Sequence, residues 1–214
     1  PFLKDVTNGQ YIPGDPDAAA FLRYAKYILE NGSLMSLDLM RYFPQGYSNL
    51  DEFSLLSHFI VYLYKFMHFF NNSITLEYVD VIFPAITFAI ALVPFYFLVK
   101  KLTNYKVALL SSAFLSFTPP FLYRTISGVG DKEALGIVFL FAAFYFYVAG
   151  FKSEHKFGYL NGLLAGLFTA LLGATWGGVN FIFLIIGGSV LVKVVFDNFG
   201  KKDFYNYILW WVAS

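Results

Sequence analysis

Long apolar stretches alternate with short polar connections through most of the chain, and their lengths predict membrane-spanning helices. A helix needs roughly 17–25 mostly apolar residues to cross a hydrocarbon core of about 30 Å. Five stretches meet or approach that length, and a sixth, truncated stretch begins near Phe204. The five cover residues 78–99, 107–122, 134–151, 158–175 and 179–196. The pattern therefore predicts an all-α, polytopic membrane protein with a transmembrane bundle over residues 78–214.

Residues 1–77 show a different pattern, which predicts a large external loop that carries helices of its own. Asp15 suits a helix N-cap and Pro16 suits the first helical position. An apolar stripe at helical spacing follows them and ends at Asn31-Gly32, so we expect a helix over residues 16–30. Residues 33–51 contain proline, glycine and several polar residues, and we expect them to form an exposed loop.

A second helix in this loop is predicted over residues 52–70, and it is amphipathic. Its polar side chains recur on one face at helical spacing: Ser54, Ser57, His58, Lys65 and His68. This arrangement favours a helix that lies at the membrane interface. A membrane-crossing helix is the alternative, and it would move everything before it to the other side of the membrane.

Basic residues in the connections between the predicted spans indicate the orientation. Alternate connections hold eight lysines on one side: Lys100, Lys101, Lys106, Lys152, Lys156, Lys193, Lys201 and Lys202. The other side holds only Arg124 and Lys132. Because the side richer in lysine and arginine is normally cytoplasmic, residues 1–77 and 123–133 are predicted to share the outer face of a cell membrane.

The composition supports a membrane protein and excludes several other classes. Of the 214 residues, 58% are hydrophobic and only 14% are charged, against about 25% charged residues in a soluble domain. A net charge of +1 argues against a nucleic-acid partner. The absence of cysteine excludes thiolate chemistry within this sequence. Because the sequence starts at Pro1 and stops inside an apolar run, we interpret it as a piece of a longer polypeptide.

Acidic residues gather on the predicted outer side. Asp15 and Asp17 come from the first loop, Glu77 and Asp80 from the start of the first span, and Asp131 and Glu133 from a later connection. Converging carboxylates can hold a hard divalent cation, which can stabilise charge on a departing phosphate. The alternative is structural: Asp15 and Asp131 are each placed to cap a helix, and Asp80 to mark the water boundary of its span.

Three motifs together suggest a family. The run from Arg124 through Gly128 to Asp131 and Glu133 resembles the second acidic motif of the oligosaccharyltransferase catalytic subunit, of the form R-x-x-x-G-x-x-D-x-[DEH]. Gly14-Asp15-Pro16 resembles the first external-loop motif of that family. The run Thr-Trp-Gly-Gly at 175–178 is similar to its Trp-Gly-Gly turn. The order, the spacing and the predicted side of the membrane agree for all three motifs.

This resemblance implies a multi-spanning glycosyltransferase of the GT-C type. Such an enzyme moves a preassembled glycan from a polyprenol (dolichol-type) phosphate or pyrophosphate carrier to Asn in Asn-x-Ser/Thr of an acceptor polypeptide, with Mn²⁺ or Mg²⁺ as cofactor. By position, Asp15 and Asp131 would be catalytic and metal-binding, Glu133 a further metal ligand, and Arg124 a substrate-binding residue. A later acidic site and a soluble domain of the family are not in this sequence, so we expect the fragment to be inactive alone.

Two other functions are alternatives to this glycosyltransferase. One is a polyprenol-phosphate-dependent protein O-mannosyltransferase or lipid-A aminosugar transferase of the same fold. The other is a transporter fragment without chemistry, which we rank last because the predicted spans contain almost no charge beyond Asp80. The absence of cysteine and the character of the motifs favour an archaeal source.

Overall fold

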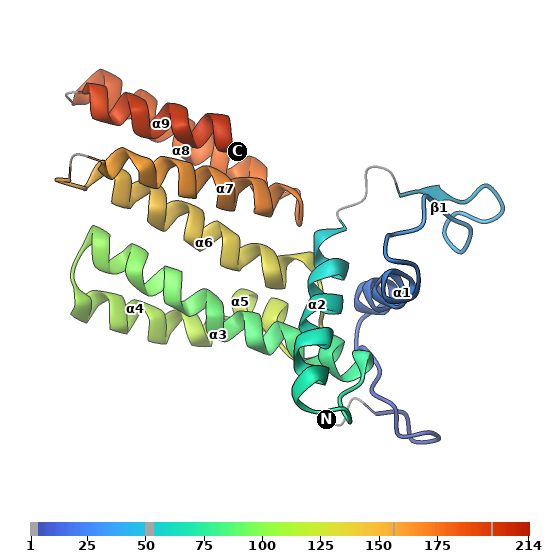
Figure 1. Ribbon diagram of the computed structural model, residues 1–214. Helices are drawn as coiled ribbons and strands as arrows, with labels where there is room; N and C mark the ends of the chain where they lie inside the picture. The colour runs from blue at the N-terminus through green and yellow to red at the C-terminus, as the bar shows by residue number, and fades with distance from the viewer. Residues whose placement is uncertain (1–3, 50–53, 156, 198) are drawn as a thin grey trace. The chain divides into compact units, whose positions relative to one another are not determined.

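The computed structural model describes residues 4–49, 54–155, 157–197 and 199–214. The chain, drawn in Figure 1, divides into two compact units. The first unit comprises Pro1–Ile86 and Tyr123–Ala134, and the second comprises Thr87–Leu122 and Leu135–Ser214. The long helix α3 (Leu76–Leu102) contributes its first turns to one unit and the rest to the other.

The first unit is built around the packing of helix α1 (Pro16–Asn31) on helix α2 (Leu55–Phe70). The buried side of α1 carries Phe21, Leu22, Ala25 and Ile28, which recur at helical spacing, as the apolar stripe predicts. Helix α1 ends at Gly32, whose positive φ of 83° closes the last turn. The predicted range of α2 began at residue 52, and residues 52 and 53 lie outside the described residues.

The α2 helix departs from the predicted amphipathic pattern at Ser57. Ser57, predicted on the solvent-facing polar face, is only 1% exposed beside Leu56 and Ile60. The opposite face exposes aromatic side chains, with Tyr62 at 65% and Phe66 at 64% exposure. The buried side of α2 therefore consists of Leu56, Ser57, Ile60 and Val61, and several of its aromatic side chains are exposed.

The segment expected to be an exposed loop, residues 33–51, contains a short antiparallel ladder. Strand β1 (Leu37–Asp38) pairs with strand β2 (Tyr47–Ser48), with Leu37 opposite Ser48. The ladder buries Asp38, which is 1% exposed. Residues 50 and 51 of the predicted loop lie outside the described residues.

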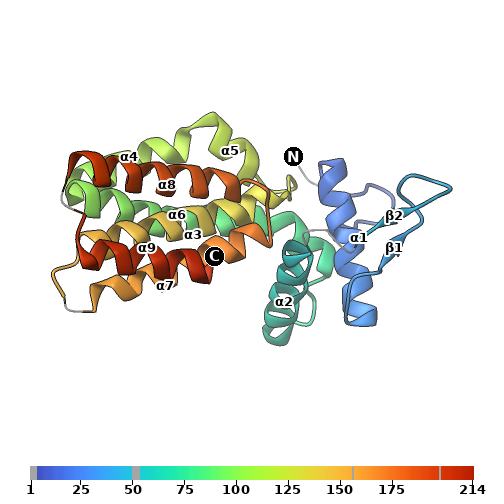
Figure 2. The ribbon, with the colours of Figure 1, turned by 90° about the horizontal axis from the view of Figure 1, so that it is seen from above.

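The second unit is a helical bundle. Figures 1 and 2 show its helices running side by side. After α3 they are α4 (Tyr105–Phe117), α5 (Pro119–Thr125), α6 (Lys132–Phe151), the 3₁₀ turn η1 (Gly158–Leu160), α7 (Asn161–Gly173), α8 (Val179–Phe196) and α9 (Lys201–Ala213). The core contains Ala143, Leu172, Ile182 and Trp210, drawn from four of these helices.

Two predicted spans are shorter in the structure than in the sequence pattern. The stretch 107–122 is divided at Thr118, where the backbone is extended and the two following prolines cannot donate helix hydrogen bonds. The stretch 158–175 starts with η1 and continues as the 13-residue helix α7. A helix of that length is about 20 Å long, less than the thickness of a hydrocarbon core.

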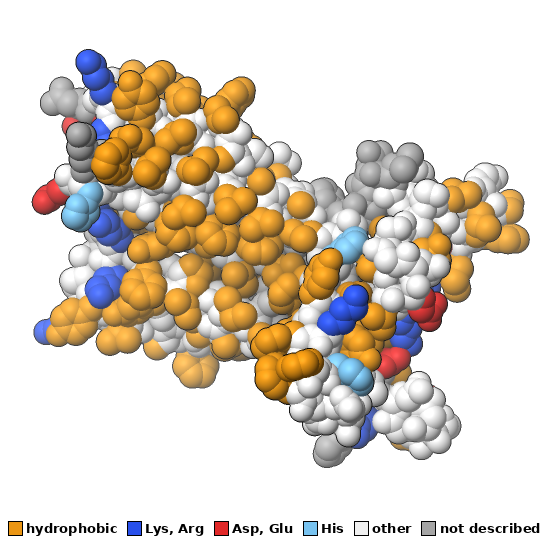
Figure 3. All heavy atoms as spheres, viewed as in Figure 1, with side chains coloured by type: hydrophobic (Ala, Val, Ile, Leu, Met, Phe, Trp, Pro, Cys, Tyr) orange, Lys and Arg blue, Asp and Glu red, His pale blue; other side chains and the backbone are white. Residues whose placement is uncertain are grey.

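Within the described residues, three helices are long and apolar enough to cross a membrane: α3, α6 and α8. Figure 3 shows hydrophobic side chains over the face that presents α3 and α7, with lysines gathered at one end of the helices. The last helix, α9, begins at Lys201, three residues before the predicted start, because Asp203 accepts a hydrogen bond from the Gly200 backbone N–H at 3.1 Å. These observations confirm an all-α membrane fold.

Candidate functional site

Asp15 stands immediately before α1 and caps it. Its backbone is extended, with φ −134° and ψ 141°, and its Oδ1 accepts a hydrogen bond from the backbone N–H of Asp17 at 2.8 Å. Pro16 occupies the first helical position, where a missing N–H costs nothing. The structural role predicted for Asp15 is therefore present, and it engages one of the two carboxylate oxygens.

The second acidic motif forms the loop between α5 and α6. Gly128 adopts a positive φ of 89°, which glycine tolerates without strain, and its N–H donates to the carbonyl oxygen of Val81 at 2.8 Å. A Cβ on Gly130 would lie 2.8 Å from the Phe83 ring, so the loop lies directly against α3. Asp131 then precedes α6, and its Oδ1 accepts from the Lys132 backbone N–H at 2.6 Å.

Arg124 lies beside both carboxylates of this motif. Its Nη1 is 3.3 Å from Oδ2 of Asp131 and 3.7 Å from Oε1 of Glu133. The two carboxylate side chains are only 16% and 19% exposed, whereas the Arg124 side chain is 43% exposed. Three of the four predicted site residues therefore form one cluster, with the guanidinium on the open side.

A backbone hydrogen bond connects the first acidic motif to the second. The N–H of Gly14 donates to the carbonyl oxygen of Gly128 at 2.9 Å. Gly14 directly precedes Asp15, and Gly128 lies three residues before Asp131. More than a hundred residues separate the two motifs in the sequence, and the fold of the first unit brings their backbones into contact.

Asp131 and Glu133 have the chemistry of two ligands in a metal site. Carboxylate oxygens are the ligands that hard divalent cations prefer. Oε2 of Glu133 is buried and has no hydrogen-bond partner within the described residues. Those same residues contain no group of three or more Asp, Glu, His or Cys side chains placed to hold an ion. Asp131 and Glu133 thus fit as two ligands, and further ligands have to complete a coordination sphere.

The other acids predicted on the outer side have different environments. Glu77 forms an ion pair with Lys26 of α1 at 2.7 Å. Asp80, predicted to mark the water boundary of its span, is instead only 1% exposed. Neither of its carboxylate oxygens has a hydrogen-bond partner among the described residues. The prediction for Asp80 is wrong because the acidic loop lies directly over the first turns of α3.

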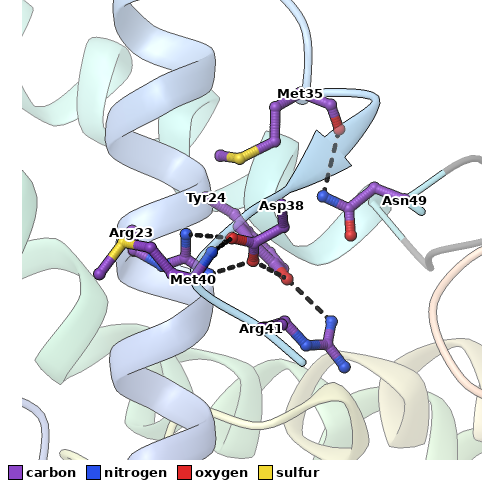
Figure 4. Close-up of polar contacts among 7 residues, drawn as sticks. All are labelled: Arg23, Tyr24, Met35, Asp38, Met40, Arg41 and Asn49. Atoms are coloured by element: carbon purple, nitrogen blue, oxygen red, sulfur yellow. Dashed lines mark hydrogen bonds and ion pairs between the residues drawn. The ribbon is translucent and has the colours of Figure 1, made fainter. Parts of the chain in front are cut away.

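A buried polar network beneath the β1–β2 ladder was missed by the sequence analysis (Figure 4). Asp38 accepts hydrogen bonds from both terminal nitrogens of Arg23, from the Tyr24 hydroxyl at 3.1 Å and from the Met40 N–H at 3.0 Å. Arg41 in turn donates to the Tyr24 hydroxyl at 2.8 Å. The network joins α1 to the ladder and so holds the segment that follows α1.

The charges in this network reinforce one another. The Arg23 guanidinium lowers the pKa of the Asp38 carboxyl to about 2, against an ordinary value of 3.8. Its bond to the Asp38 carboxylate raises the pKa of Arg23 in turn, and burial raises the pKa of the Tyr24 hydroxyl. Strands β1 and β2 have only two residues each, which is too short for an alternating pattern of apolar and polar residues. The sequence therefore does not predict the ladder that contains Asp38.

The Trp-Gly-Gly turn lies in the second unit, between α7 and α8. A Cβ on Gly178 would lie 2.2 Å from the Trp176 ring, so only glycine lets the indole fold back over its own turn. The Trp176 side chain also approaches Gly136 of α6, where a Cβ would lie 3.3 Å from the ring.

Comparison with known proteins matches nearly the whole chain to one family. The family model described as oligosaccharyl transferase STT3, N-terminal, matches residues 7–213. The chain is 25% identical over 152 residues to the dolichyl-diphosphooligosaccharide–protein glycosyltransferase subunit stt3 of Schizosaccharomyces pombe. It is 24% identical over 215 residues to the dolichyl-phosphooligosaccharide-protein glycotransferase of Methanococcus voltae. The matches cover 71% and 94% of this chain, but only 20% and 23% of those relatives.

Solved structures share the fold. The oligosaccharyltransferase of Archaeoglobus fulgidus, in a crystal structure with Zn and sulfate, superimposes with a TM-score of 0.75 at 21% identity. The match covers 97% of this chain and 27% of that one. A second structure of the Archaeoglobus enzyme, in complex with an inhibitory peptide and a dolichol-phosphate, gives a TM-score of 0.70 at 18% identity.

Proposed function

The chain belongs to the oligosaccharyl transferase STT3 family, and from this membership we propose that the complete protein is a membrane oligosaccharyltransferase. Its reaction moves a preassembled glycan from a polyprenol phosphate or pyrophosphate carrier to the side-chain amide of Asn in Asn-x-Ser/Thr. The family assignment favours this reaction over polyprenol-phosphate-dependent O-mannosyl transfer, lipid-A aminosugar transfer and transport. The chain spans about a fifth of the relatives' length, so it supplies one part of the machinery.

One observation carries the proposal. The hydrogen bond from Gly14 to Gly128 brings the backbone beside Asp15 against the loop that ends at Asp131. A reaction between a lipid-linked donor and a peptide acceptor needs both substrates held at one place. Two acidic motifs that meet through their backbones supply such a place.

In this proposal the cluster of Arg124, Asp131 and Glu133 receives the donor phosphate and its metal ion. Asp131 and Glu133 present carboxylate oxygens for Mn²⁺ or Mg²⁺, and the buried Oε2 of Glu133 without a described partner fits such a ligand. When bound, the cation offsets the negative charge that develops on the leaving phosphate. Arg124, more exposed than either carboxylate, is placed to contact a phosphate oxygen or the acceptor backbone.

Asp15 acts on the acceptor amide in this scheme. An amide nitrogen is a poor nucleophile because its lone pair is delocalised into the carbonyl group. A carboxylate that accepts hydrogen bonds from the N–H groups can hold the amide in position for attack on the anomeric carbon. The cap hydrogen bond engages only Oδ1 of Asp15, so Oδ2 is left for this contact within the described residues.

The site is proposed to lie on the outer face of a multi-pass membrane protein. The lysine-rich connections would then face the cytoplasm. The exposed aromatic face of α2, which includes Tyr62 and Phe66, suits a helix lying in the membrane interface.

The full-length protein with Asp15→Asn or Asp131→Asn tests this function. Transfer of glycan to a fluorescent sequon peptide is measured with a polyprenol-linked donor. We expect each substitution to lower kcat/KM at least a hundredfold, since each removes a charge that contacts the reacting groups. Glu30→Gln is the matched control, because Glu30 is an exposed carboxylate at the other end of α1. Retained activity in both site variants would refute the assignment.

A further inference from the structure

The first unit contains a cavity of about 490 Å³ that the proposed chemistry does not use. It lies between the segment before α1, the end of α2 and the start of α3, and Asn8, Tyr11, Asn71 and Tyr78 are among its lining residues. Pockets for small ligands typically have volumes of about 300–1,000 Å³. The cavity is therefore large enough for a ligand and is formed by three separate segments.

The polar part of the lining consists mainly of neutral groups. Asn8, Gln10 and Asn71 contribute side-chain amides, and Ser73 and Thr75 contribute hydroxyl groups. Oδ1 of Asn8 accepts from the Gln10 backbone N–H at 2.9 Å, and Oδ1 of Asn71 accepts from the Ser73 N–H at 3.0 Å. The side-chain N–H groups of both asparagines have no partner within the described residues, so they remain as donors for a ligand.

This lining combines polar, apolar and few charged groups. No Lys or Arg is among the described residues that line the cavity, but the Nζ of Lys4 lies 4.6 Å from the centroid of the Tyr11 ring beside it. The one carboxylate of the described lining, Glu77, is already paired with Lys26 at 2.7 Å. The rings of Tyr11 and Tyr78, whose centroids are 5.0 Å apart, add apolar surface together with Met67 and Ile74. Amides, hydroxyls and aromatic C–H surface together suit a polyhydroxylated, uncharged ligand such as a sugar.

The cavity lies next to the junction of the two acidic motifs. Tyr11 is three residues before Gly14, and Tyr78 is about one helical turn before Val81. Gly14 and Val81 are the two residues whose backbones bond to Gly128. Three extended residues span about 10 Å and one helical turn about 5.4 Å, so the cavity lies within the length of a short oligosaccharide from this junction.

We propose that this cavity binds a sugar of the transferred glycan beyond the one attached to the carrier. The inference rests on the proposed function, because it places the first sugar at the acidic motifs and a later sugar in the cavity. The amides then recognise glycan hydroxyl groups, and the enzyme favours donors with a longer glycan.

Two donors on the same polyprenol carrier test this inference in the full-length protein, one with the complete glycan and one with a single sugar. Gln10→Ala removes an amide from the cavity, and Gln10→Trp fills space there. Gln45→Ala and Gln45→Trp are matched controls, because Gln45 is an exposed amide that does not line the cavity. Both glutamines are exposed, so the substitutions leave the core intact.

We expect Gln10→Ala to raise KM for the complete donor about fivefold, the effect of one lost hydrogen bond, and Gln10→Trp to raise it further. For both variants, kcat and the KM for the single-sugar donor stay at the wild-type values. Equal effects on both donors, or no effect on either, would overturn the inference. Failure of the proposed function has another signature, because the wild-type protein would then transfer neither donor to a sequon peptide.

Discussion

At the residue scale, the most consequential side chain outside the acidic motifs is Asp38. It is 1% exposed and accepts hydrogen bonds from two side chains of α1. Burying a carboxylate is costly unless it is paired and hydrogen-bonded, and Arg23 and Tyr24 supply both. The sequence predicts the cap at Asp15, because a cap depends on neighbours within three residues. It does not predict the role of Asp38, because that depends on a partner fifteen residues away.

The first prediction concerns the pH dependence of this network. In the folded chain the pKa of Asp38 is about 2, below its ordinary value of 3.8. The carboxylate therefore stabilises the fold fully above about pH 4, and this contribution is lost as the pH falls toward about 2. Asp38→Asn should reduce hydrogen-exchange protection of the β1–β2 amides at pH 6 by about ten- to a hundredfold, equivalent to about 1–3 kcal/mol.

The difference between wild type and Asp38→Asn should shrink as the pH approaches 2, since the wild-type carboxyl is then protonated too. Glu30→Gln, at an exposed position of α1, serves as the control and should leave protection unchanged. Equal protection of wild type and Asp38→Asn at pH 6 would show that the network does not hold the ladder.

At the element scale, the long helices could be predicted because apolar length alone specifies them. The start and end of α8 agree with the pattern, since nothing inside that stretch interrupts helix hydrogen bonds. Apolar length alone does not locate the break at Thr118, which Pro119 and Pro120 mark, or the short length of α7, because apolar composition continues through both. The β1–β2 ladder is too short to leave any periodic signal.

Close packing between α7 and α9 gives the second prediction. A Cβ on Gly166 would lie 2.5 Å from the Trp210 carbonyl oxygen and 2.6 Å from the Ala213 Cβ. Gly166→Leu should therefore destabilise the bundle by about 1–3 kcal/mol and lower its unfolding temperature in detergent. Gly187→Leu is the control, because no atom lies within 4 Å of the corresponding Cβ position. An unchanged unfolding temperature for Gly166→Leu would contradict this packing.

The loop between α5 and α6 gives the third prediction. Gly128 needs a positive φ, and alanine at that position costs about 1–2 kcal/mol. Gly128→Ala should weaken the hydrogen bonds to Gly14 and Val81 and so separate the acidic motifs. The expected result is a higher Mn²⁺ concentration for half-maximal transfer, with normal expression of the protein. Gly187→Ala should leave that concentration unchanged, and a normal Mn²⁺ requirement in Gly128→Ala would count against the role of the loop.

At the scale of the whole molecule, the apolar stretches and the distribution of lysines predict the membrane fold and a topology. The periodicity of the sequence does not predict that the two acidic motifs come together in space. The family resemblance, carried by three short motifs, implied that Asp15 and Asp131 act together. The contact between their backbones arises from the packing of α1, α2 and α3 in the first unit. No sequence pattern near Asp15 indicates which distant residues pack beside it.

The predicted topology can be tested by labelling. The sequence contains no cysteine, so Gln45→Cys and His155→Cys each introduce one thiol into this part of the protein, in a full-length background from which other cysteines are removed. Both positions are exposed. A membrane-impermeant maleimide should label Gln45→Cys in intact cells and His155→Cys only after permeabilisation. The reverse pattern would place the acidic motifs on the cytoplasmic side.

The central claim is that Asp15 and the Asp131–Glu133 pair form one site. Anomalous diffraction from the full-length protein crystallised with Mn²⁺ tests it most directly. We expect one manganese peak within about 2.6 Å of carboxylate oxygens from both Asp15 and Asp131. A manganese ion bound to Asp131 and Glu133 with Asp15 far outside coordination distance would contradict it.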